Sequence, residues 1–205
     1  AVCRPERANL PLLAARAAIA LGIQARTTGD IDEAVQCLQD VVDPLDAPTL
    51  LPDVWQLRVH YLIGFLHLVS GDAQVASAHL QRARRLMPPG YEPSHHLLRL
   101  QKALAWAHWR RGAPDEALAS ADEGANTARR AHNGAHLIDF LGFKAMVHSE
   151  AGRFAARAAC LADLDDHAQT AEERSLRDVW HDVVARHDDE PVRISPEATN
   201  LHPRV

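Results

Sequence analysis

The sequence predicts an all-α fold, built from four stacked helix-turn-helix repeats and closed by one more helix. Two observations lead to this prediction. The 205 residues are rich in Ala, Leu and Arg, which favour helices, whereas only 5% are aromatic and runs of β-branched residues are nearly absent. In addition, glycines recur at positions 29, 71, 112 and 152, every 40–42 residues. A fixed period of this length is the signature of a repeat architecture.

Other positions keep step with these glycines. The residue seven positions earlier is small and the residue nine positions later is apolar: Gly22, Gly64, Ala105 and Ala145 in the first set, Leu38, Leu80, Ala121 and Leu161 in the second. Glycine can end a helix in the left-handed conformation, and small residues let two helix backbones approach closely. Asp30 or Asp72 is expected to cap the helix after its glycine, and Pro114 suits a first helical turn. Each unit is therefore predicted to be two antiparallel helices joined by a tight turn.

The predicted repeats span about 8–43, 51–87, 94–131 and 134–167. Their first helices are expected over 8–28, 51–70, 94–111 and 134–151, and their second helices over 31–43, 73–87, 114–131 and 153–167. A ninth helix over 171–186 places four apolar residues on one face and is predicted to cap the last repeat: Leu176, Val179, Trp180 and Val183. Residues 1–186 are thus predicted to form one repeat domain, and residues 187–205, with three prolines, a flexible tail.

These positions carry a resemblance to the tetratricopeptide repeat family. Leu21-Gly22, Ile63-Gly64 and Leu104-Ala105 are each followed by Gly-x-x-x-x-Ala, which is similar to the family's pattern, and the match covers about residues 8–168. The repeats are longer than the ~34 residues usual in that family. In this they resemble the helical-repeat arms of large bacterial transcription activators of the maltose-regulator type. The resemblance implies a right-handed α-solenoid, which would serve as the arm of a bacterial regulatory or signalling protein and bind a partner in its concave groove.

The resemblance also implies which side chains line that groove, because in the family the first helix of each pair faces it. In the first three repeats these residues are mostly basic or aromatic: Arg16, Arg26, Arg58, Tyr61, Phe65, Arg99, Lys102, Trp106, Trp109 and Arg110. In the fourth repeat they are Asp139, Gly142, Met146, Ser149 and Glu150. Arg16, Arg58 and Arg99 share one repeat position, so they are expected to form a ladder that suits an acidic, partly apolar peptide segment or domain. The alternative is that the aromatic residues pack against a neighbouring helix and the arginines form a solvated face.

Histidines and aspartates raise the question of a catalytic or metal site. His67, His108 and His148 share one repeat position, where we expect core histidines bonded to a neighbour rather than metal ligands. A second cluster falls at a predicted helix end and is expected to be solvated charge: Asp163, Asp165, Asp166 and His167. The sequence contains no glycine-rich phosphate loop, no GxSxG, no HExxH and no paired cysteines. We therefore predict a non-enzymatic protein with no metal and no cofactor.

Charge and hydropathy limit the partners. The net charge of −5 argues against general nucleic-acid binding, and no apolar run is long enough to cross a bilayer. Cys3, Cys37 and Cys160 are too few and too scattered for a disulfide framework, so a reducing, cytoplasmic setting is expected. Because the chain begins at Ala1 rather than at a methionine, we expect a processed product or a piece of a longer protein.

The leading prediction is a scaffold for protein–protein interaction. Three other functions stay open on the sequence alone. The chain could be a small-molecule-sensing arm of a transcription regulator, or an enzyme on a helical scaffold that uses its histidines and aspartates. It could also be a structural homo-oligomer whose groove is filled by its own tail.

Overall fold

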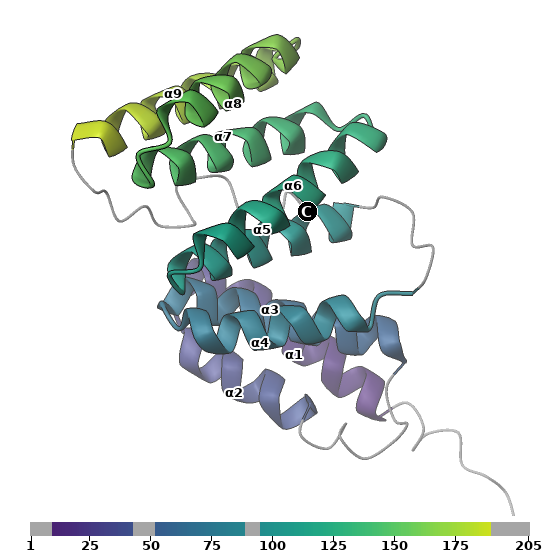
Figure 1. Cartoon of the computed structure of the whole chain (residues 1–205). Coiled ribbons are helices and arrows are strands. Elements are labelled where there is room, and N and C mark those ends of the chain that lie inside the picture. Colours follow the sequence, from purple (N-terminus) through teal and green to yellow (C-terminus); the bar gives the residue numbers. More distant parts are fainter. Residues whose placement is uncertain (1–9, 43–51, 89–94, 190–205) are drawn as a thin grey trace, which may run out of the picture. The chain divides into compact units, whose positions relative to one another are not determined.

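The structure, a computed structural model, describes residues 10–42, 52–88 and 95–189 of the chain (Figure 1). Nine helices and no strand lie within these ranges, and well over two-thirds of the residues in them are helical. The prediction of an all-α fold is therefore confirmed. The chain divides into two compact units, which we call unit 1 (Ala1–Tyr91) and unit 2 (Glu92–Val205).

Unit 1 contains two antiparallel helix pairs. The first pair is α1 (Leu10–Thr28) with α2 (Ile31–Val42), and the second is α3 (Asp53–Ser70) with α4 (Ala73–Arg85). Helix α3 packs against both helices of the first pair. The core between them is aliphatic and includes Ala18, Leu38, Val59 and Leu62. Unit 1 therefore repeats one supersecondary element and buries apolar surface between its two copies.

Unit 2 contains two further pairs and the last helix. These are α5 (His95–Arg110) with α6 (Pro114–Arg130), α7 (Gly134–Glu150) with α8 (Phe154–His167), and α9 (Ala171–Asp189). Helix α7 packs against α6 on one side and against α9 on the other. The largest fully buried side chains of unit 2 are Trp106, Phe140 and Trp180. Its core is thus aromatic, in contrast to the aliphatic core of unit 1.

The four repeat glycines occupy equivalent turns. Each lies between the two helices of a pair and has a positive φ angle: +87° at Gly29, +99° at Gly71, +78° at Gly112 and +66° at Gly152. In the last three turns the amide after the glycine donates to the carbonyl five residues back, which belongs to His67, His108 or His148. Such bonds satisfy carbonyls that a helix end leaves without partners. The predicted left-handed glycine turn is confirmed in all four pairs.

Two predicted local details are also confirmed. The Asp72 side chain caps α4 by accepting a hydrogen bond from the Val75 amide at 3.1 Å. Pro114 is the first residue of α6. The small residues allow close helix contacts as expected, since a Cβ placed on Gly22 would lie 2.5 Å from a methyl carbon of Leu62, and one on Gly64 would lie 2.7 Å from Leu80.

Two helices end a few residues away from the approximate ends predicted for them. Helix α4 ends at Arg85 rather than 87, because Pro88 disfavours the helical conformation of the residue before it. Helix α9 continues to Asp189 rather than 186, because no glycine or proline interrupts it before Pro191. Residues 187–189 of the predicted tail are therefore helical, and the rest of that tail, 190–205, lies outside the described residues.

Candidate functional site

The predicted groove residues of unit 1 fall into an exposed set and a buried set. Arg16 on α1 and Arg58 on α3 are exposed, Tyr61 is half-buried, and Phe65 is buried. Arg26 lies in α1, and its side chain is outside the described part of the structure. The two exposed arginines share a repeat position, thirteen residues before the turn glycine, on two helices that pack together.

Arg58 and Tyr61 each rest on an aromatic neighbour. The guanidinium carbon of Arg58 lies 5.3 Å from the ring centroid of Trp55, within the range of a cation–π interaction. The Tyr61 and Phe65 rings are stacked, with their centroids 6.3 Å apart. Unit 1 thus presents cationic and aromatic side chains next to each other at its surface.

In unit 2, a predicted groove cation is part of the core. Lys102 on α5 is buried, and its Nζ donates to Oδ2 of the buried Asp139 on α7 at 2.5 Å. The other oxygen of Asp139 accepts a hydrogen bond from the indole nitrogen of Trp180 on α9 at 3.2 Å. A buried charge needs such partners. Lys102 and Asp139 therefore tie three helices of unit 2 together.

The predicted tryptophans of unit 2 also make internal contacts. Trp106 is fully buried, with ring centroids 5.0 Å from Phe143 and 5.2 Å from Trp109. Trp109 is half-buried, and its indole nitrogen donates to Oε2 of Glu150 at 2.5 Å. Trp106 thus packs against Phe143 of the neighbouring α7, as the alternative interpretation expects of the aromatic residues.

The remaining predicted residues of unit 2 are partly exposed. Arg99 and Arg110 are half-buried on α5, and burial lowers the pKa of Arg110 below its ordinary value. In the fourth repeat, Asp139, Gly142, Met146 and Ser149 are buried, and only Glu150 is exposed. Part of this face is covered by α9, because a Cβ on Gly142 would lie 2.2 Å from the ring of Trp180. The predicted groove face of α7 is therefore a packing face for α9.

A histidine cluster in unit 1 was not predicted from the sequence. His60 on α3 is buried, and its Nδ1 lies 3.1 Å from Nδ1 of His79 on α4. His67 stacks on His79, with the two ring centroids 6.2 Å apart. One of the two facing nitrogens must carry a proton and the other must accept it. The repeat pattern aligns His67 with His108 and His148, which lie at the same position of other repeats. It gives no information on contacts between the two helices of one pair, such as that of His79 on α4 with His60 on α3.

The other repeated histidines have separate surroundings. His108 is buried and pairs with Glu116 through a 2.9 Å contact, and Arg111 contacts the same carboxylate. His148 is half-buried, and desolvation together with the nearby Lys144 lowers its pKa. The expectation of a core histidine bonded to a neighbour is met most clearly at His108. Among the residues that the structure describes, no group of three or more His, Cys, Asp or Glu side chains could hold a metal ion.

His136 on α7 is held neutral by its position. Its pKa is lowered to about 3, mainly by desolvation and then by the positive charges of Lys102, His95 and Arg99. Its Nδ1 lies 3.0 Å from the side-chain oxygen of Asn133, and the same oxygen accepts from the His136 amide at 3.1 Å. At neutral pH the imidazole therefore completes the N-terminal cap of α7 without adding charge.

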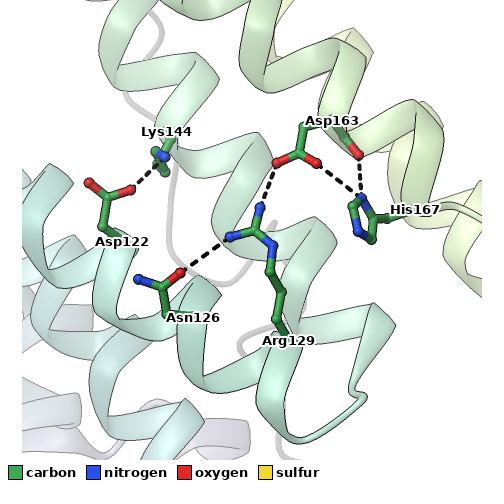
Figure 2. Close-up of polar contacts among 6 residues, drawn as sticks. All are labelled: Asp122, Asn126, Arg129, Lys144, Asp163 and His167. Atoms are coloured by element: carbon green, nitrogen blue, oxygen red, sulfur yellow. Dashed lines mark hydrogen bonds and ion pairs between the residues drawn. The ribbon is translucent and has the colours of Figure 1, made fainter.

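Asp163 and His167 of the acidic cluster at the end of α8 belong to a network of surface ion pairs (Figure 2). Asp163 accepts from Arg129 of α6 at 2.6 Å, and its other oxygen lies 3.1 Å from Nδ1 of His167. In the same region Lys144 of α7 pairs with Asp122 of α6 at 2.5 Å. Each of these pairs is partly exposed, so each stabilises the fold only slightly. The network links the helices around α7.

A nucleophile near this network is not activated. The Cys160 thiol lies one turn before Asp163 on α8, and burial raises its pKa above the ordinary value. A thiol acts as a nucleophile only when it is deprotonated. The same Asp163 carboxylate is paired with Arg129 of α6.

No family model matches the chain, and no curated protein matches it. Among the described residues, no helix has both the length and the apolar character needed to span a membrane.

Proposed function

We propose that this chain is a non-enzymatic protein-binding module, and that unit 1 holds an acidic, partly apolar segment of a partner protein. The contact surface in this proposal consists of Arg16, Arg58, Tyr61 and Trp55. The observation that carries it is the exposure of two arginines at the same repeat position of two packed helices, with an aromatic ring under one of them.

The chemistry of this surface suits carboxylates. A guanidinium group can bind a carboxylate through two parallel hydrogen bonds, which a lysine cannot do. Because Arg58 lies against the Trp55 ring, it loses less conformational freedom on binding than a fully mobile side chain would. Tyr61, half-buried beside Phe65, offers an apolar edge and a hydroxyl group next to the charges.

The predicted groove residues of unit 2 contribute less to this proposal. Lys102 and Trp106 are buried, and Trp109 binds Glu150, so their side chains already serve the fold. The non-enzymatic part of the proposal is supported by the polar clusters that the sequence singled out. The Cys160 thiol has a raised pKa, and Asp163 and Asp165 at the end of α8 are engaged in ion pairs.

We also propose that the helix pairs are tetratricopeptide-like repeats of a right-handed solenoid, acting as the arm of a regulatory protein in the cytoplasm. The recurrence of the same left-handed glycine turn in four helix pairs supports the repeat assignment. The 40–42-residue period supports the likeness to regulator arms. Cys37 and Cys160 are free thiols, which fits a reducing compartment.

The proposal is tested with fluorescein-labelled peptides and the charge-reversed variant Arg16→Glu/Arg58→Glu. A peptide that alternates glutamate with leucine and phenylalanine should bind the native chain, whereas the same peptide with lysine in place of glutamate should not. In the variant, repulsion replaces attraction at two positions, so Kd should rise by tenfold or more, which is about 1.4 kcal/mol. Fluorescence anisotropy measures both affinities, and added salt should weaken the native complex.

The matched control is Arg84→Glu/Arg85→Glu, which makes the same change in net charge on the exposed last turn of α4. It should bind as the native chain does, and circular dichroism should show that both variants are folded. Equal affinity of the native chain and of Arg16→Glu/Arg58→Glu would contradict the proposed surface. Failure of every acidic peptide to bind the native chain would contradict the proposed partner class.

A further inference from the structure

Helix α9 occupies two of the predicted groove positions of α7. Asp139 and Gly142 lie thirteen and ten residues before the turn glycine Gly152, and both were predicted to line the groove. The indole ring of Trp180 lies over Gly142 so closely that a Cβ there would collide with it. The indole nitrogen donates to Oδ1 of Asp139 at 3.2 Å. Trp180 therefore lies where the predicted groove would receive a side chain of a partner.

Glu173 shows that α9 lies lengthwise along α7. Gly134 is the first residue of α7, and a Cβ on it would collide with the carboxylate of Glu173. Glu173 precedes Trp180 by seven residues, and Gly134 precedes Gly142 by eight, so the two contacts are about two turns apart on each helix. The two helices therefore run in the same direction. A carboxylate is also favoured at this end of α7, because a helix N-terminus carries partial positive charge.

The packing of α9 differs from that of the other helices that follow a pair. Helix α3 packs against both helices of the pair before it, and α7 mainly against α6, the second helix of the pair before it. Helix α9 instead packs mainly against α7, the first helix of its preceding pair. Its contacts with α8 include surface pairs of Asp165, with His181 at 3.0 Å and with Arg177 at 3.9 Å. Such exposed pairs stabilise little. Helix α9 is therefore held mainly by one face of α7.

This face of α7 has the features of a receptor for a helix. The equivalent positions of α3 hold Arg58, which is exposed, and Tyr61, which is half-buried. In α7 they hold a buried carboxylate and a glycine. Glycine is unfavourable inside a helix, but here the missing side chain leaves the space that Trp180 fills. The carboxylate of Asp139 beside this space accepts a hydrogen bond from the side chain that enters it.

We propose that α9 is an internal ligand of unit 2, which blocks a helix-binding site on α7 and is displaced by a helix of a partner protein. The partner helix carries a glutamate and, about two turns later, a tryptophan, the side chains that α9 places at Gly134 and Gly142. Lys102 and Asp139 stay paired when α9 leaves, because they belong to α5 and α7. The site is separate from the surface proposed in unit 1 and does not depend on it.

A fluorescein-labelled peptide with the sequence of residues 168–189 tests the proposal on full-length chains. Each chain also carries Arg16→Glu/Arg58→Glu, which removes the acidic-peptide surface proposed in unit 1, so the two proposals can fail separately. In Trp180→Ala the internal helix loses its anchor, and the peptide should bind. With Trp180 intact, the tethered α9 competes at an effective concentration in the millimolar range, so binding should be at least about tenfold weaker. Fluorescence anisotropy measures both affinities.

The matched control is Val179→Ala, which shortens an exposed side chain next to the anchor. It should bind the peptide as weakly as the chain in which Trp180 is intact. In the peptide, Trp180→Phe removes the N–H group that Asp139 accepts, so its affinity for the Trp180→Ala chain should fall by about tenfold. Equal binding to Trp180→Ala and Val179→Ala would contradict the proposal, and so would equal affinity of the two peptides.

Hydrogen exchange in the native chain tests the release of α9 directly. The amides of α9 should exchange faster than those of α7, and Trp180→Ala should accelerate exchange in α9 alone. Circular dichroism should show that Trp180→Ala is folded. If α9 exchanges only together with α7, or if Trp180→Ala unfolds, α9 is an integral part of unit 2 and the proposal is wrong. Failure of the peptide to bind the folded Trp180→Ala chain would overturn it as well.

Discussion

Two side chains from different helices meet at the buried carboxylate of Asp139. Lys102 of α5 supplies the opposite charge and Trp180 of α9 a neutral donor, so both carboxylate oxygens have partners. The attraction between two buried charges is offset by the cost of removing them from water. Removing one partner alone is different, because the other charge then stays buried without compensation. At the scale of single residues, this pair is where unit 2 is most sensitive to substitution.

Asp139→Asn should lower the free energy of unfolding by about 3–5 kcal/mol, because it keeps the shape but leaves the Lys102 charge unpaired. The double variant Lys102→Met/Asp139→Asn should recover most of that loss, since no buried charge remains. The matched control is Asp122→Asn, which breaks the more exposed pair with Lys144 and should change stability by less than about 1 kcal/mol. Urea unfolding followed by circular dichroism measures all three. Equal losses for Asp139→Asn and Asp122→Asn would contradict this account.

The sequence contains a signal for this pair that is visible only in retrospect. The repeat position that holds Arg16, Arg58 and Arg99 holds Asp139 in the fourth unit, so the charge changes sign there. Periodicity predicts which positions share a face. It does not predict that Asp139 of one repeat neutralises Lys102, which stands at a different position of the repeat before it.

At the scale of helices, α9 is fixed on α7 by a close contact. The Trp180 ring lies over Gly142, with room for no Cβ between them. Apolar spacing predicted this helix and placed Trp180 on its apolar face, and Trp180 is fully buried. The spacing also placed Val179 on the buried face, but Val179 is 41% exposed and Val184 is buried in its stead. The reason is geometric, because Trp180 and Val184 are one turn apart and share one helical face.

The substitution Gly142→Ala tests that contact, because the change in the free energy of unfolding should have the opposite sign from that expected at an open helix position. In an open helix position this substitution stabilises by about 0.5–1 kcal/mol, because glycine is a poor helix former. Here the new methyl group would collide with Trp180, so we expect a loss of about 1–3 kcal/mol. Combined with Trp180→Phe, which leaves more space, the two effects should be far from additive. A stabilised Gly142→Ala variant in thermal unfolding would show that α9 does not cover this part of α7.

At the scale of the whole molecule, the repeat pattern predicted the order of the nine described helices and their turns because each repeat is a local unit. Helix pairs are set by residues close in sequence, such as the turn glycines and the small residues before them. The division into two units was not predicted. The spacing of the turn glycines is nearly the same in both units. The period alone therefore does not predict which neighbouring helix pairs belong to the same compact unit.

Unit 2 should fold without unit 1, because both partners of its buried polar contacts, and the aromatic residues of its core, belong to unit 2 itself. Lys102–Asp139–Trp180 is one such set, and a second is the 3.2 Å hydrogen bond from Gln101 of α5 to Thr127 of α6. We expect the fragment 92–205 to be helical by circular dichroism and to unfold in one cooperative thermal transition. In that fragment, as in the full chain, we expect Asp139→Asn to lower the midpoint temperature of thermal unfolding. An unfolded or non-cooperative fragment would mean that unit 2 depends on residues of unit 1 for its stability.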